Sequence, residues 1–170
     1  MGAFPTWSPG KILRASDLRG TQPDIIQASV TQSINMSVTS TRDQELFFRA
    51  EAGAQYLAEV YLLVNVSVAN EIQYQWDVPS GATSRSMSWG ATTVDASYLS
   101  RSATRVHVGA GFQTISEHRI EETVDSLIWG RLNLITSSVP GVVGIDYIPT
   151  IVAGTLNRDL YSFMRVTRYA

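Results

Sequence analysis

Apolar and polar residues alternate with a period of two along residues 54–79, the longest patterned stretch of the chain. Apolar side chains occupy the even positions from 56 to 68 and again from 72 to 78. A period of two turns one face of a β-strand toward a core and the other toward solvent. The pattern therefore predicts two strands, and Ala69-Asn70 between them predicts the turn of a long antiparallel hairpin.

The first of these two strands is apolar on both faces. Leu57, Tyr61 and Leu63 interrupt the polar residues at its odd positions. A strand of this kind lies either inside a sandwich or against another subunit. Both interpretations stay open, and the second makes Leu57, Tyr61 and Leu63 the candidate subunit-interface residues.

Shorter alternating runs predict further strands in the rest of the chain. They fall within residues 28–38, 46–48, 83–89, 115–124, 127–137, 142–152 and 160–169, and residues 91–113 are expected to hold one strand and a long loop. Turns are predicted at residues 39–44, 79–81 and 157–159, and residues 125–126 are expected to close a second hairpin. Many short strands without a long helix predict an all-β fold, a two-sheet antiparallel β-sandwich that best matches a jelly roll.

Residues 1–27 lack this alternation and are interrupted by proline and glycine. Their large apolar side chains either pack on the chain's own domain or dock into a neighbouring protein. The second interpretation predicts a docking arm at residues 1–27, followed by a single β-sandwich domain at residues 28–170. The candidate docking residues are Phe4, Trp7, Ile12, Leu13 and Leu18.

Composition narrows the classes of function. With 170 residues, 44% hydrophobic and 16% charged, the chain has the size and character of one globular domain. It has no cysteine, which excludes disulfides, thiolate nucleophiles and zinc held by cysteine. A net charge of −2 with scattered arginines argues against nucleic-acid binding, and no run approaches the roughly 20 apolar residues of a membrane span.

Candidate chemistry is sparse. The two histidines, His107 and His118, belong to no metal-binding motif, and no nucleophile elbow or P-loop is present. His118 lies among Glu117, Arg119 and Glu121, which predicts a solvated, charged strand face. The sequence therefore predicts no enzyme activity, no catalytic residue, no metal and no cofactor.

The opening FPTWSPGKILRASDLRG resembles the W-x-x-G-x-x-L-x-A-x-D-L leader of small virion proteins from tailed phages of actinobacteria. The matching residues are Trp7, Gly10, Leu13, Ala15, Asp17 and Leu18, and Arg19 stands where the leader usually has asparagine. Residues 39–64, the segment YQWDVPSGA and the C-terminal LYSFMRVTRYA are also similar, in the same order. The resemblance thus covers most of the chain in outline.

This resemblance implies a structural role in a virion that assembles in the bacterial host cytoplasm. Proteins of this kind are decoration, head-fibre or minor tail proteins, commonly homotrimers with jelly-roll knobs. Without internal repeats that would form a stalk, a capsid decoration (cement) protein bound by its arm to the major capsid protein is the leading expectation.

Two alternatives remain. A minor tail or baseplate protein would contact the host surface and bind a glycan there, with Trp89, Tyr98 and His107 as candidate groove residues. The other alternative, a stand-alone carbohydrate-binding β-sandwich, would bind a glycan without being part of a virion.

Overall fold

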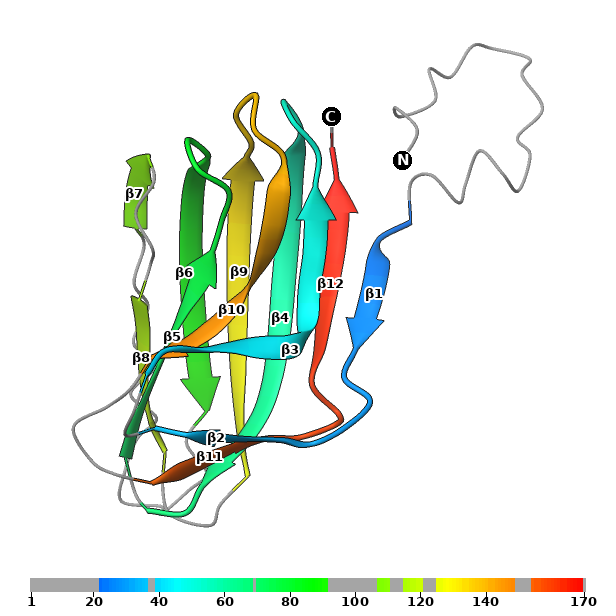
Figure 1. Cartoon of the computed structure of the whole chain (residues 1–170). Coiled ribbons are helices and arrows are strands. Elements are labelled where there is room, and N and C mark those ends of the chain that lie inside the picture. Colours follow the sequence, from blue (N-terminus) through cyan, green and yellow to red (C-terminus); the bar gives the residue numbers. More distant parts are fainter. Residues whose placement is uncertain are drawn as a thin grey trace.

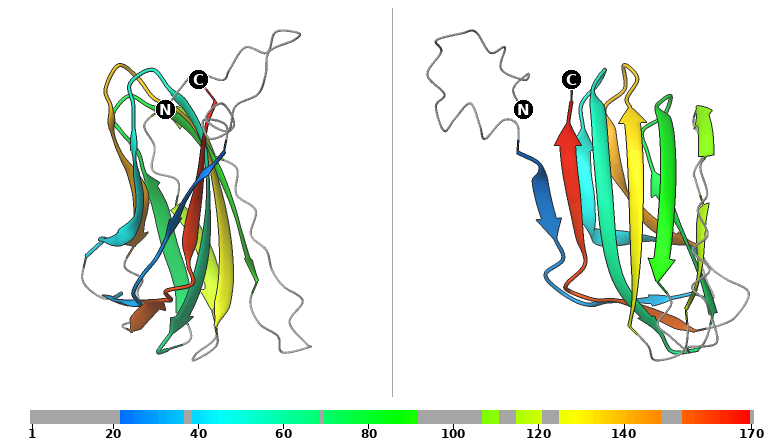
Figure 2. Two further views of the ribbon diagram at one scale, coloured as in Figure 1. Left: turned by 90° about the vertical axis from the view of Figure 1, so that its right-hand side faces the viewer. Right: turned by 180° about the vertical axis from the view of Figure 1, so that it is seen from behind.

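A computed structural model describes residues 22–36, 39–68, 70–91, 107–110, 115–120, 125–148 and 154–169. All regular elements in these ranges are β-strands, arranged in two antiparallel sheets that pack face to face (Figures 1 and 2). The predicted all-β sandwich is confirmed. Within the described ranges, no helix is long and apolar enough to span a lipid bilayer.

The larger sheet has eight strands. Six of them follow the order β1 (Asp24–Gln27), β12 (Phe163–Arg168), β4 (Gln55–Val66), β9 (Ser126–Ile135), β6 (Thr83–Ala91) and β7 (His107–Ala110). The short strands β2 (Gln32–Asn35) and β11 (Thr155–Arg158) pair with each other, and β11 also pairs with β4. The smaller sheet has the order β3 (Thr41–Ala50), β10 (Gly141–Ile148), β5 (Asn70–Asp77) and β8 (Ile115–Ile120).

Strand pairing in the two sheets is nested. β1 pairs with β12, β3 with β10, β4 with β9 and β5 with β8, so strands early in the chain pair with strands late in it. The runs β1-β12-β4-β9 and β3-β10-β5-β8, one in each sheet, have the nested order of a jelly roll, as predicted. β6 and β7 are inserted between β5 and β8 and widen the larger sheet.

Side-chain alternation places the core between the sheets. Every even position of β4 from Tyr56 to Val66 is buried, as are Ile128, Leu132 and Leu134 of β9. The smaller sheet contributes large side chains, among them Tyr74, Trp76, Ile145 and Tyr147. Full burial of a large apolar side chain contributes about 1.5–3 kcal/mol, so these rows hold the sheets together.

Both predicted hairpins are wrong. β4 and β5 are consecutive in the chain but lie in different sheets, and so do β8 and β9. The edges of β4 are occupied by β9, β12 and β11, and those of β5 by β10 and β8. Alternation identifies a strand and its buried face, but it carries no information on which distant strand supplies the hydrogen bonds.

Two predicted turns are strands in the structure. β3 begins at Thr41, within the stretch predicted as a turn, and β11 contains Asn157 and Arg158. Their polar sequences are typical of turns. In the structure, charged side chains of both strands instead form ion pairs within the molecule. Conversely, the strand predicted at residues 28–38 is reduced to Gln32–Asn35.

The predicted arm is shorter than expected at its C-terminal end. Residues 24–27 form β1, which pairs with β12 at one edge of the larger sheet (Figure 1). These residues therefore belong to the sandwich. Residues 1–21 lie outside the described ranges, together with the five candidate docking residues, whose role stays a prediction.

Candidate functional site

The outer face of the larger sheet carries the three candidate interface residues. Because the even positions of β4 enter the core, Leu57, Tyr61 and Leu63 lie on the opposite surface, where they are half-buried. The structure thus brings all three together outside the sandwich interior. The right-hand view of Figure 2 shows this face toward the viewer, with the smaller sheet behind it.

An aromatic row crosses the middle of this face. Phe163 of β12 lies opposite Tyr61 of β4, which lies opposite Trp129 of β9. The Tyr61 and Phe163 rings stack with centroids 4.5 Å apart at 14°, and the Tyr61 and Trp129 centroids are 6.2 Å apart at 31°. Trp89 of β6 is the next residue in register, opposite Trp129.

The geometry of the row decides what it can contact. Nearly parallel rings with centroids 4.5 Å apart cannot lie flat side by side, so they stand upright on the sheet at about the spacing of neighbouring strands. They present mainly their edges outward. A sugar or base that stacks needs an exposed ring face, whereas ring edges pack well against apolar protein side chains.

Aliphatic side chains extend the row along the strands. Leu63 pairs in register with Leu127, which is 47% exposed, and Leu57 lies on the other side of the aromatic row. Further out, Ile135 is 51% and Ile25 66% exposed. These exposed apolar side chains make the outer face of the larger sheet the candidate interaction surface.

A cationic row borders the aromatic one. Arg165, Glu59 and Arg131 are consecutive in register across β12, β4 and β9, and Arg85 of β6 is exposed one row further. Arg165 and Glu59 form an ion pair of 3.8 Å, and the Nε atom of Arg131 is buried without a hydrogen-bond partner in the described part of the chain. Three arginines and one carboxylate thus lie in these two rows, and the carboxylate of Asp125 accepts a hydrogen bond from Asn65 further along the same face.

A second polar cluster lies in the interior, around Arg158 of β11. Its Nε is 3.0 Å from Asp43 Oδ2 and its Nη2 3.1 Å from Glu45 Oε2, while Nη1 donates to the Val30 carbonyl at 2.7 Å. The Tyr147 hydroxyl donates to Asp43 Oδ2 at 2.8 Å. Burial, followed by the Asp43 charge, raises the Tyr147 pKa well above its usual value.

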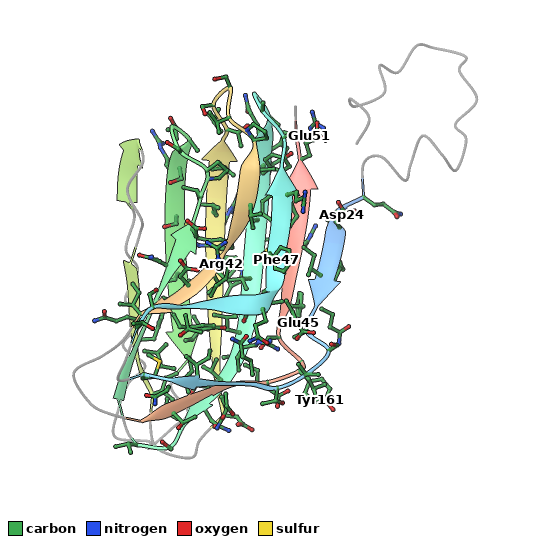
Figure 3. All side chains as sticks on the ribbon, viewed as in Figure 1. Asp24, Arg42, Glu45, Phe47, Glu51 and Tyr161 are labelled. Carbon is green, nitrogen blue, oxygen red and sulfur yellow. The ribbon has the colours of Figure 1, made fainter. Side chains whose placement is uncertain are left out.

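This cluster joins the two sheets and fixes the segment that links β1 to β2. Glu45 accepts hydrogen bonds from the Ser29 hydroxyl and from the Ser29 amide, at the side of the molecule marked in Figure 3. The Ser29 hydroxyl is the main cause that lowers the Glu45 pKa to about 2, against the opposing effect of burial. Because Arg158 binds groups of its own chain through all three guanidinium nitrogens, we assign the cluster a structural role.

His118 is buried, which corrects the predicted solvated face. Its Nε2 lies 3.0 Å from Ser88 Oγ, and its ring stacks on Tyr74 with centroids 6.0 Å apart. Burial lowers its pKa to about 4, so the imidazole is neutral at pH 7. The described residues hold no cluster of histidine and carboxylates that would bind a metal ion.

The predicted glycan groove stays a prediction. Tyr98 lies outside the described residues. His107 is in β7, in register with Ser86 of β6, three positions from Trp89. The structure therefore does not bring the three together as a described site.

Sequence reasoning missed Arg158 and the wider apolar face. The alternation of β11 places Arg158 on the same side as Leu156, which is fully buried. A period of two in the sequence could therefore have indicated that Arg158 is buried. The aromatic row was not predictable in the same way, because Phe163, Tyr61 and Trp129 come from three strands far apart in the chain. Only the strand order makes them neighbours.

No protein-family model matches the chain, and no curated protein matches it. Among solved structures, it is weakly similar to the infectious bursal disease virus VP2 subviral particle, with 10% identity and a TM-score of 0.21. Structures of the Gx and Gt strains of infectious bursal disease virus give 11% and 12% identity, with TM-scores of 0.19 and 0.20. Each match covers 86% of this chain, which spans 37%, 36% and 37% of those chains, respectively. Similarity at this level carries no inference about function.

Proposed function

We propose that this chain is a structural component of a tailed-phage virion, a capsid decoration protein that assembles as a homotrimer. The observation that carries the proposal is the apolar outer face of the larger sheet, on which Leu57, Tyr61 and Leu63 lie beside the aromatic row. A protein that works as a lone unit gains nothing from exposing such a surface. The leader resemblance at Trp7, Gly10 and Leu13 supports the choice of a virion.

In this proposal the two apolar regions have different partners. The outer face of the larger sheet contacts a neighbouring copy, with Tyr61, Phe163 and Trp129 as the anchors that aromatic residues typically provide in interfaces. The docking arm, now residues 1–21, binds the major capsid protein through Phe4, Trp7, Ile12, Leu13 and Leu18. No catalytic step and no cofactor take part.

The upright aromatic row separates this proposal from the carbohydrate-binding alternative. Stacking of a sugar ring requires an exposed aromatic face, and Phe163 covers one face of Tyr61 while Trp129 lies 6.2 Å from it on the neighbouring strand β9. Within the described residues, this row is therefore better suited to protein contact than to a glycan. A minor tail position is compatible with the same surface and is distinguished by experiment.

The test adds fluorescently or gold-labelled full-length protein to purified phage particles that lack the endogenous protein, followed by electron microscopy. Label spread regularly over the heads is the expected result. A truncation to residues 22–170, which keeps β1 complete, serves as the matched control and should not bind. Label confined to tail tips would replace decoration by the minor tail function, and absence of label from the whole particle would contradict a virion role.

A further inference from the structure

The outer face of the smaller sheet, which points away from the core, carries a patch of aromatic and polar side chains. Phe47 of β3 and Asp77 of β5 both lie opposite Gly144 of the central strand β10, so the three form one row across the sheet. Figure 3 shows Phe47 and Arg42 on this face, toward the viewer. Phe47 is 40% exposed and makes no ring contact with another described aromatic residue, so its ring, unlike that of Tyr61, is uncovered.

Gly144 leaves the middle of this row without a side chain. A Cβ atom at Gly144 would lie 3.2 Å from the Phe47 Cβ atom, closer than ordinary van der Waals contact. Neighbouring strands lie about 4.8 Å apart, so the backbones that carry Phe47 and Asp77 are about 10 Å from each other. The row thus has an aromatic side chain at one end, a carboxylate at the other and bare backbone between them.

The next row along the same face, which we call the polar row, consists of Arg42, Asp146 and Gln75, consecutive in register across β3, β10 and β5. The Arg42 guanidinium donates to Asp146 through Nε at 3.2 Å and to Asp77 through Nη2. Its Nη1 has no hydrogen-bond partner in the part of the chain that the structure describes, and each carboxylate uses one oxygen only. The ion pairs therefore hold one unused donor and two unused acceptors in fixed positions at the surface.

Gln75 is buried in a way that the packing of the sandwich does not require. Because Tyr74 and Trp76 are buried in the core, alternation turns Gln75 toward the outer face, beside Asp146. It is only 7% exposed, yet its side-chain amide has no hydrogen-bond partner among the described residues. An amide removed from water without a partner destabilises the molecule, and a bound hydroxyl group would satisfy it.

This set of groups suits a neutral saccharide. The C–H face of a sugar ring packs on an aromatic ring, and its adjacent hydroxyl groups can both donate to a carboxylate and accept from an amide or a guanidinium. Two carboxylates beside one guanidinium disfavour an anion such as a phosphate, and the guanidinium between them disfavours a cation. Small-molecule sites typically combine an apolar surface with a few polar groups placed in this manner.

We propose that the outer face of the smaller sheet binds a neutral saccharide. The sugar ring lies over Gly144 against the ring of Phe47, and its hydroxyl groups bond to Asp77 and to the polar row. The inference goes beyond the proposed virion role, in which the larger sheet contacts neighbouring copies. The smaller sheet lies on the other side of the core (Figure 2), so both faces can be occupied at once.

The test applies saturation-transfer difference NMR to the full-length chain with the methyl glycosides of glucose, galactose, mannose and N-acetylglucosamine as probes. Titration of each glycoside that gives a signal yields its dissociation constant. Phe47→Ala removes the stacking surface, and Tyr161→Ala is the matched control, since Tyr161 is 68% exposed and lies outside the patch. Gln75→Met keeps the length of the side chain and removes its amide.

We expect at least one glycoside to bind the wild type, and Phe47→Ala and Gln75→Met each to raise its dissociation constant about tenfold. Tyr161→Ala should bind as the wild type does. Thermal melting separates ligand binding from a structural role, because Gln75→Met should melt at the same temperature as the wild type or higher, having lost only an amide without a partner. A clear drop in its melting temperature would make Gln75 a structural residue and overturn the inference.

The inference is also overturned if none of the four glycosides binds, if Phe47→Ala binds as tightly as the wild type, or if Tyr161→Ala weakens binding as much as Phe47→Ala does. The particle-labelling experiment involves no sugar, so its outcome is independent of this one. A chain that labels heads and binds no glycoside would keep the decoration function without the saccharide site, and a chain that binds a glycoside and labels no particle would do the reverse.

Discussion

Arg158 shows how one charged side chain can organise the interior of this sandwich. It is completely buried, pairs with the equally buried Asp43, and reaches Glu45 and the Val30 carbonyl. Burying an ion pair brings little net stability, but removing one partner leaves an uncompensated charge in the core. The position is therefore far more sensitive to substitution than a surface arginine.

We expect Arg158→Met to lower the free energy of unfolding by about 3–5 kcal/mol, because Asp43 stays buried without its guanidinium partner. Urea denaturation followed by circular dichroism measures the change. Arg42→Met is the matched control, since Arg42 is exposed and pairs with Asp77 and Asp146 at the surface, where such pairs contribute less than about 1 kcal/mol. Equal losses for the two variants would contradict the role assigned to Arg158.

His118 links stability to pH. Burial lowers its folded-state pKa to about 4 from 6.5, so the unfolded chain binds a proton more readily than the folded one. The contribution of neutral His118 is fully present above pH 6.5 and is lost as the pH falls toward 4. The difference amounts to about 3 kcal/mol.

We expect the free energy of unfolding to fall between pH 6.5 and 4, and His118→Gln to reduce this slope while it keeps a polar group near Ser88. Chemical denaturation at a series of pH values gives the slope for both proteins. The contribution of Glu45, whose pKa is lowered from 4.5 to about 2, is lost as the pH falls below about 4.5, so the upper part of the window separates the histidine from it. An identical slope in the two proteins would show that His118 is not the titrating group.

At the scale of elements, the inner faces of β6 and β9 are matched in size to the opposite sheet. Ser84, Ser86 and Ser88 of β6 are buried and small. A side chain at Gly130 of β9 would collide with the Tyr74 hydroxyl of β5. Small residues on the larger sheet thus make room for Tyr74 and His118 on the smaller one.

Gly130→Ala should lower the free energy of unfolding by about 1–3 kcal/mol, because the added methyl group overfills a close-packed layer. Gly154→Ala is the control, since its nearest neighbour, Ser67 Oγ, would be at an ordinary 3.5 Å. Thermal unfolding by calorimetry compares the two. If both variants melt together, the packing of Tyr74 over Gly130 is looser than described.

The strands themselves were largely predictable, and their partners were not. The alternation in residues 54–79 locates β4 and β5 and their buried faces, because it reflects burial on one side of each strand. It gave a false hairpin, because neither strand pairs with its neighbour in the chain. At the candidate site, Leu57, Tyr61 and Leu63 were found from their odd positions, whereas Phe163 and Trp129 become their neighbours only through the nested order.

At the scale of the whole molecule, β1 marks where the sandwich begins. Its four residues pair with β12, so the domain should be complete from residue 22 onward. A chain of residues 22–170 is expected to keep the circular dichroism spectrum of the full protein and a melting temperature within about 3 °C of it, since it retains every described strand of the sandwich. A chain that begins at residue 28 lacks β1 and should melt lower.

The comparison of these two truncations separates docking from folding. If residues 22–170 unfold at a much lower temperature than the full chain, the first 21 residues contribute to the domain's own stability. In that case loss of particle binding by the truncated chain would no longer identify them as an arm.

The nested strand order also sets the timing of folding. β5 and β8 are the nearest of the nested partners in the chain, whereas β1 can pair only after the distant β12 has been synthesised. Contacts between residues so distant in sequence make folding slow, because closing a long loop costs conformational entropy before the stabilising contact has formed. The inner strands therefore have time to collapse before β1 and β12 close this edge of the larger sheet.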